Sequence, residues 1–167
     1  MSAWFHRPKY TIIRNVEKKE TKIPEGMWVK CDRCDSIILT KELADNLNVC
    51  PKCGLHKRVT AKDRVAMLVD EGTFNIMFED VQPVDYLNFP QYKDKLEKSK
   101  KATGLSESVI TGTGKMNGLE VALGVTDFLF MGGSLGSVMG ERLTSLCETA
   151  ISNKLPVIIV SASGGGA

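Results

Sequence analysis

The pattern of apolar and polar positions in the second half of the chain predicts strands that alternate with a helix. From Ser108, the runs "SVITGTGKM" and "LEVALGVTDFLFM" flank the dipeptide Asn117-Gly118, which supplies the positive φ angles of a tight hairpin turn. A glycine loop follows, and "PVIIVSA" is typical of a final buried strand. The segment between them has one apolar helical stripe, formed by Met139, Leu143, Leu146, Cys147, Ala150 and Ile151. Strand, loop, helix and strand in this order predict a βαβ crossover with parallel strands.

Two further helices are predicted ahead of this unit. The segment "TAKDRVAMLVDEG" opens with the capping-box residues Thr60 and Asp63 and ends at Gly72. Its apolar positions fall on one helical face, which comprises Ala61, Val65, Leu68 and Val69. The polar, lysine-rich segment "DYLNFPQYKDKLEKSKKATG" predicts an exposed helix that ends near Gly104.

Two glycine loops, "GGSLG" at 132–136 and "SGGG" at 163–166, are the candidates for chemistry in this unit. Both follow predicted neighbouring strands, at the edge where open α/β sheets place ligands. Glycine frees backbone N–H groups to stabilise an oxyanion or enolate, although glycines also occur in plain tight turns. Neither loop matches a phosphate-binding pattern, and no nucleophile elbow is present.

Composition places the chain among globular proteins of one or two domains. It has 167 residues, 43% of them hydrophobic, and a net charge of +2. The start, "MSAWFHRPKY", lacks the apolar stretch of a signal peptide, and no run is long enough to cross a bilayer. We therefore expect a cytoplasmic, reducing location without membrane association, where cysteines are thiols or metal ligands.

Four of the five cysteines have the spacing of a metal site. Cys31 and Cys34 form one C-x-x-C pair, Cys50 and Cys53 form another, and fifteen residues separate the pairs. Two such turns can close a tetrahedral shell of four thiolates around zinc, whereas a redox motif needs only one pair. Since no coordination position remains for water, we expect one structural Zn²⁺ ion. Cys147 stands alone in a helix, where a small buried side chain is the simplest interpretation.

Charge is distributed unevenly between the two parts of the chain. Residues 1–62 hold thirteen Lys and Arg against seven Asp and Glu, whereas residues 63–167 hold nine against thirteen. A basic ribbon can bind the phosphates of nucleic acid or a coenzyme, or it can simply be a solvated surface. A zinc-ribbon nucleic-acid-binding protein is therefore the alternative hypothesis from the ribbon alone.

The order of these motifs resembles a known family. "CDRC" and "CPKCG", then "RVAMLVDEGTF", "KKATGLSESVITGTGKMNG", "VTDFLFMGGSLGSVMGERL" and "PVIIVSASGGGA" are similar to the β subunit of bacterial acetyl-CoA carboxylase carboxyltransferase. The resemblance runs over nearly the whole chain. It implies an α/β (α+β) chain with a zinc ribbon at 1–58 and the first part of a crotonase-like (ClpP/crotonase) domain of ββα units at 59–167.

The same resemblance implies an activity and partners. In this family, a carboxyl group moves from carboxybiotin on the biotin carboxyl carrier protein to acetyl-CoA, giving malonyl-CoA for fatty acid biosynthesis. The implied partners are a carboxyltransferase α subunit in an α₂β₂ assembly and the biotin carboxylase complex. The glycine pair of the SASGG motif, Gly164 and Gly165, is expected to hold the thioester oxygen through backbone N–H groups. Gly132 and Gly133 are expected to line the CoA side.

The end of the sequence departs from the family pattern. The pattern continues as Ser-Gly-Gly-Ala-Arg-Met, whereas this chain has Gly166 in place of the alanine and Ala167 in place of the arginine. A crotonase-type core also needs further strands and helices after this point. We therefore expect a truncated domain that folds poorly and lacks activity by itself, because an unfinished sheet exposes an edge and an apolar face.

Overall fold

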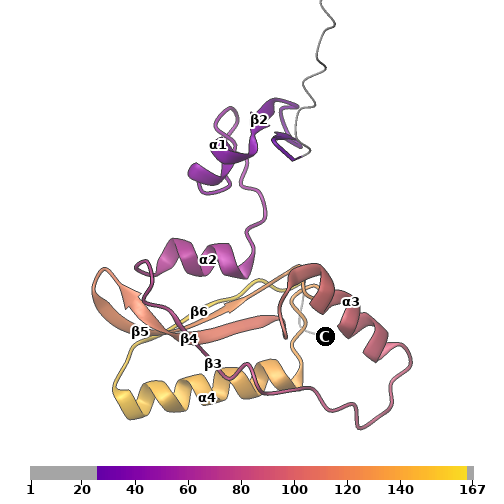
Figure 1. The fold of residues 1–167 in the computed structure, drawn as a ribbon, viewed down its shortest axis with the longest axis vertical. Coiled ribbons are helices and arrows are strands. Elements are labelled where there is room, and N and C mark those ends of the chain that lie inside the picture. The colour runs from indigo at the N-terminus through magenta and orange to yellow at the C-terminus, as the bar shows by residue number, and fades with distance from the viewer. Residues whose placement is uncertain (1–25, 165–167) are drawn as a thin grey trace, which may run out of the picture.

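The computed structural model describes residues 26–164, which form a small cysteine-rich ribbon and a larger α/β unit (Figure 1). An extended linker, residues 57–60, joins them. In the ribbon, β1 (Trp28–Lys30) pairs antiparallel with β2 (Ile37–Leu39), and α1 (Thr40–Asp45) follows directly. Its core is small: the buried apolar side chains are Ile38 and Leu43, packed with Cys31 and Cys50. Such a core contributes little burial, so the ribbon depends on other interactions for its stability.

A four-stranded sheet with the order β3-β4-β5-β6 organises the larger unit. Its strands are β3 (Asn75–Met77), β4 (Val109–Met116), β5 (Leu119–Thr126) and β6 (Val157–Val160). The first three are antiparallel neighbours, and β5 and β6 are parallel. The predicted hairpin and the predicted parallel pair are both confirmed. The short strand β3 was not predicted from the sequence.

The hairpin turn is held by a carboxylate from outside it. Asn117 and Gly118 have φ angles of 51° and 81°, as a tight turn requires. The Asp70 carboxylate accepts hydrogen bonds from the N–H groups of both residues, at 3.0 and 2.8 Å. The Asp70 N–H in turn donates to the Lys115 carbonyl oxygen at 2.7 Å. Asp70 thereby joins the segment after α2 to the end of the β4–β5 hairpin.

These contacts of Asp70 correct the predicted end of the first long helix. α2 (Ala61–Leu68) begins as predicted, because the Thr60 hydroxyl accepts a hydrogen bond from the Asp63 N–H. It ends at Leu68 rather than at Gly72, since Val69 is already extended. The backbone that would continue the helix is used instead to reach the hairpin.

The two remaining helices match their predicted spans, but one buried face was predicted incorrectly. α3 (Tyr92–Thr103) ends at Gly104, which has the left-handed conformation of a helix C-terminus. α4 (Ser137–Asn153) connects β5 to β6. In α4, Ile151 is 77% exposed, whereas Arg142 is only 2% exposed.

The buried face of α4 includes Arg142 because the surrounding backbone supplies acceptors for its guanidinium. Its nitrogens donate to the carbonyl oxygens of Glu79 and Val81, at 3.0 and 3.1 Å, and to the Ser106 hydroxyl at 3.0 Å. Burial lowers the pKa of Arg142 from its usual value. Arg142 therefore fixes the loop after β3 against α4.

Helices cover both faces of the sheet, with α2 on one side and α4 on the other (Figure 1). β5 shows this in its alternation: Val121, Leu123 and Val125 belong to the cluster that includes α2, whereas Ala122 packs with Leu146 of α4. A central strand buried on both faces is typical of sheets with a βαβ crossover. In the described part of the chain, no helix is long and apolar enough to span a membrane.

Candidate metal centre and glycine-loop site

Two similar turns position the four cysteines. In the first, the Cys31 carbonyl accepts from the Asp35 N–H at 3.0 Å, and the Cys31 N–H donates to the Ser36 carbonyl at 2.9 Å. The second turn repeats these bonds, with the Cys50 carbonyl accepting from Gly54 and the Cys50 N–H donating to Leu55. Asp35 and Gly54 take the same left-handed conformation, with φ of 56° and 69°. Each C-x-x-C pair thus sits on the same kind of tight turn.

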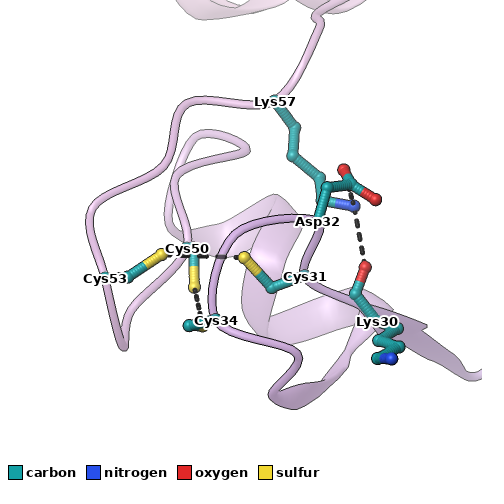
Figure 2. Close-up of polar contacts among 7 residues, drawn as sticks. All are labelled: Lys30, Cys31, Asp32, Cys34, Cys50, Cys53 and Lys57. Atoms are coloured by element: carbon teal, nitrogen blue, oxygen red, sulfur yellow. Dashed lines mark hydrogen bonds and ion pairs between the residues drawn. The ribbon is translucent and has the colours of Figure 1, made fainter.

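The four sulfur atoms lie at the separations that a tetrahedral zinc shell requires. All four are within 4.8 Å of one another, with Cys31 to Cys53 at 3.6 Å and Cys34 to Cys50 at 3.8 Å (Figure 2). A zinc–sulfur bond of about 2.3 Å in a tetrahedron places sulfur atoms roughly 3.8 Å apart. The set fits one structural zinc ion, and the spacing-based prediction of the ligands is consistent with this geometry.

The protein by itself does not favour four thiolates at once. Hydrogen bonds with the Ser36 hydroxyl and N–H lower the pKa of Cys34 to about 6. Burial has the opposite effect on Cys53 and raises its pKa to about 12. Because metal binding needs every ligand deprotonated, a bound cation must supply the stabilisation that Cys53 lacks.

Lys57 attaches the linker to the first cysteine turn. Its Nζ donates to the Lys30 carbonyl oxygen at 3.0 Å and pairs with the Asp32 carboxylate at 3.2 Å (Figure 2). Asp32 lies between Cys31 and Cys34 in the sequence. The start of the linker is therefore held by the same turn that presents two of the ligands.

The cysteine cluster should bind zinc, and the order of the ribbon should depend on that zinc. We expect one zinc ion per chain, and we expect Cys50→Ser to abolish stoichiometric zinc and loosen residues 27–56, because the ribbon has little apolar core. Elemental analysis and hydrogen exchange measure the two effects.

Cys147→Ser is the matched control, because Cys147 lies on α4 outside the four-sulfur cluster. This variant should retain zinc and an ordered ribbon. Zinc-free protein after purification without chelator, or full zinc content in Cys50→Ser, would contradict the assignment.

The two glycine loops meet in the structure. The loop after β5 contains Gly132 and Gly133, with φ angles of 71° and 70°. A Cβ atom on Gly133 would lie 2.1 Å from the Ala162 carbonyl oxygen, so only glycine allows this approach. The Gly164 N–H donates to the Gly132 carbonyl oxygen at 2.8 Å. Gly165 lies outside the described residues.

Two residues at the end of β5, which the sequence pattern did not indicate, complete the candidate site. The Thr126 hydroxyl accepts from the Ala162 N–H and so joins the end of β5 to the loop after β6. Asp127 is 2% exposed, and its carboxylate accepts from the N–H groups of Ala61 and Leu129, both at 2.8 Å. The sequence feature that could have indicated Asp127 is an acidic residue directly after an apolar strand.

Two families match the chain. Residues 28–53 match the acetyl-CoA carboxylase zinc finger domain, and residues 56–167 match the carboxyl transferase domain. These two matches cover the cysteine turns and both glycine loops, respectively.

Curated relatives match over nearly the whole chain. The acetyl-coenzyme A carboxylase carboxyl transferase subunit beta of Endomicrobium trichonymphae is 49% identical over 157 residues, which are 94% of this chain and 55% of the relative. The subunit of the same name from Desulforamulus reducens is 46% identical over 168 residues, covering 96% of this chain and 58% of the relative. The chain thus spans somewhat more than half the length of these relatives.

Solved structures share the fold. A transcarboxylase 12S structure with hydrolysed methylmalonyl-coenzyme A bound is 25% identical, with a TM-score of 0.54 over 65% of this chain and 20% of that chain. A single-chain, multi-domain long-chain acyl-CoA carboxylase is 19% identical, with a TM-score of 0.53 over 66% of this chain and 11% of that chain.

Sequence, cysteine geometry and fold therefore lead to one assignment. The ribbon fits the zinc finger domain, and the α/β unit has the crotonase-like fold of carboxyltransferases. By the match over residues 56–167, the chain belongs to the carboxyl transferase domain family.

Proposed function

We propose that this chain is part of the β subunit of an acetyl-CoA carboxylase carboxyltransferase. The complete protein would transfer a carboxyl group from carboxybiotin to acetyl-CoA and form malonyl-CoA. The observation that carries the proposal is the contact between the two glycine loops at adjacent strand ends, since the Gly164 N–H reaches the Gly132 carbonyl oxygen at 2.8 Å. The names of the curated relatives support acetyl-CoA as one of the two substrates.

The proposed chemistry places charge on the thioester oxygen. The acetyl methyl group loses a proton, and the resulting enolate carbon forms a bond to the carboxyl carbon as the bond from that carbon to the biotin nitrogen breaks. The electron pair of the broken bond stays on the biotin nitrogen, which takes up the proton lost by the methyl group. Negative charge develops on the thioester oxygen of the enolate, where fixed N–H donors stabilise it most. We assign these donors to Gly164 and Gly165, and we place Gly132 and Gly133 on the CoA side.

The hydrogen bond of Gly164 refines this assignment. Because its N–H already donates to the Gly132 carbonyl oxygen, it can serve the substrate only by exchanging that partner. Its other function is to hold the loop after β6 against the loop after β5. Gly165 is therefore the first residue to test as an oxyanion donor.

The proposal also includes partners, a location and a domain division. An α subunit in an α₂β₂ assembly, the biotin carboxyl carrier protein and the biotin carboxylase complex would supply the biotin half of the reaction in the cytoplasm. We propose a boundary between a ribbon at 1–58 and the carboxyltransferase domain at 59–167. The alternative, a zinc-ribbon nucleic-acid-binding protein, is less well supported, since both family matches come from carboxylases or carboxyltransferases.

A reconstitution assay tests the function. The full-length β subunit mixed with its α subunit should convert acetyl-CoA to malonyl-CoA with carboxybiotin, whereas β alone should be far slower, because biotin-binding residues are expected on the partner. Product formation is followed with radiolabelled carboxybiotin. Equal rates for β alone and for the mixture would contradict the two-subunit site, and no transfer by the mixture would contradict the proposed function.

A substitution tests the glycine donor in the same assembly. Gly165→Val adds a branched side chain where the thioester oxygen is expected and misdirects the N–H. Loss of one oxyanion donor typically lowers turnover by about a hundred- to a thousandfold. We therefore expect kcat to fall by about that factor with little change in KM and normal zinc content.

Gly118→Ala is the control for this substitution. Gly118 has a φ of 81° in the hairpin turn, so alanine should reduce stability but spare the chemistry. If Gly165→Val folds, assembles with its partner and keeps turnover within a few fold of the wild type, Gly165 has no oxyanion role.

A further inference from the structure

We propose that Arg58 and Phe128 position the glycine loops for catalysis, with the Arg58 guanidinium holding the Phe128 ring against Gly164. The inference rests on the function proposed above. It assigns a positioning role to two residues that lie outside the glycine loops themselves.

The first contact is between the linker and the segment after β5. The guanidinium carbon of Arg58 lies 4.2 Å from the centroid of the Phe128 ring, which is the geometry of a cation–π interaction. Arg58 is exposed, and none of the ion pairs found within residues 26–164 involves it. The aromatic ring is therefore the partner that orients its side chain.

The second observation is that the Phe128 ring lies beside the loop after β6. A Cβ atom built on Gly164 would lie 3.5 Å from Cε2 of Phe128 and 3.8 Å from its Cζ. The same Cβ would lie 3.5 Å from the Gly132 carbonyl oxygen. Gly164 is thus flanked by the Phe128 ring on one side and by the other glycine loop on another.

Both ends of this arrangement are anchored. Lys57, the residue before Arg58, is bound to the first cysteine turn through Lys30 and Asp32. Asp127, the residue before Phe128, accepts a hydrogen bond from Ala61 at 2.8 Å. The linker is therefore bonded to the ribbon just before Arg58, and the start of α2 is bonded to the segment after β5 at the residue before Phe128.

Loss of the contact between Arg58 and Phe128 is expected to affect kcat rather than the binding of acetyl-CoA. Displacing Gly164 would disturb the loop in which the oxyanion donors are proposed, but it removes no group proposed to hold the CoA tail. A small misplacement of a catalytic group can lower the rate by as much as a hundredfold. Loss of the Arg58–Phe128 contact should therefore lower kcat and leave KM for acetyl-CoA nearly unchanged.

The experiment compares three variants in the full-length β subunit assembled with its α subunit. Arg58→Ala removes the cation, Phe128→Leu removes the ring, and Arg58→Lys keeps a positive charge over the ring. We measure kcat, KM for acetyl-CoA, and hydrogen exchange in the peptide that covers residues 157–164. Lys41→Ala, which removes an exposed positive charge from α1 of the ribbon, is the matched control.

We expect Arg58→Ala and Phe128→Leu to lower kcat by roughly ten- to a hundredfold, with KM within about twofold of the wild type. Exchange in residues 157–164 should be faster in both variants, because the N–H groups of Ala162 and Gly164 are protected by bonds to Thr126 and Gly132. Arg58→Lys should recover most of the turnover and the protection. Lys41→Ala should match the wild type in every measurement.

Three results would overturn the proposal. Unchanged exchange in Arg58→Ala and Phe128→Leu would show that the pair does not hold the loop, whatever the activity. Faster exchange with normal kcat would show that the pair does not position the reacting groups. A raised KM with normal kcat would instead make Arg58 a substrate-binding residue. Absence of carboxyl transfer by the wild-type assembly is a separate outcome, which contradicts the proposed function, and the exchange measurement still tests the contact.

Discussion

The close approach of two backbone segments at the ends of β5 and β6 is the constraint on which the α/β unit depends. The two strands are parallel neighbours, so their carboxyl ends lie at the same edge of the sheet. There the loop after β5 comes so close to Ala162 that a Cβ on Gly133 would lie 2.1 Å from its carbonyl oxygen. Glycine is needed at this edge first for packing. The same lack of side chains would give the proposed substrate access to backbone N–H groups.

The buried Asp127 carboxylate joins the segment after β5 to the start of α2. Asp127 accepts hydrogen bonds from the first N–H of α2 and from its own loop, and a carboxylate at a helix N-terminus is favourably placed in the field of the helix. The linker that begins at the cysteine turns therefore ends at the glycine loops. The segment of chain between the candidate metal centre and the candidate active site is thus hydrogen-bonded near both of its ends.

Short sequence motifs predicted those features of the fold that depend on residues close together in the sequence. The C-x-x-C spacing predicted the four cysteines whose sulfur atoms lie together, Asn117-Gly118 predicted the hairpin, and Thr60 with Asp63 predicted the start of α2. The remaining features depend on residues far apart in the sequence. α2 ends early because Asp70 binds the hairpin turn, Arg142 is buried because loop carbonyls surround it, and Arg58 meets Phe128 only in the folded chain.

The most direct test of the account is a structure of the full-length subunit, assembled with its partner and bound to acetyl-CoA. The account predicts that the thioester oxygen lies about 2.7–3.1 Å from the Gly165 backbone nitrogen, with the pantetheine arm passing the loop that contains Gly132 and Gly133. A thioester bound away from both glycine loops, or turned so that its oxygen faces no backbone N–H of this segment, would contradict the account.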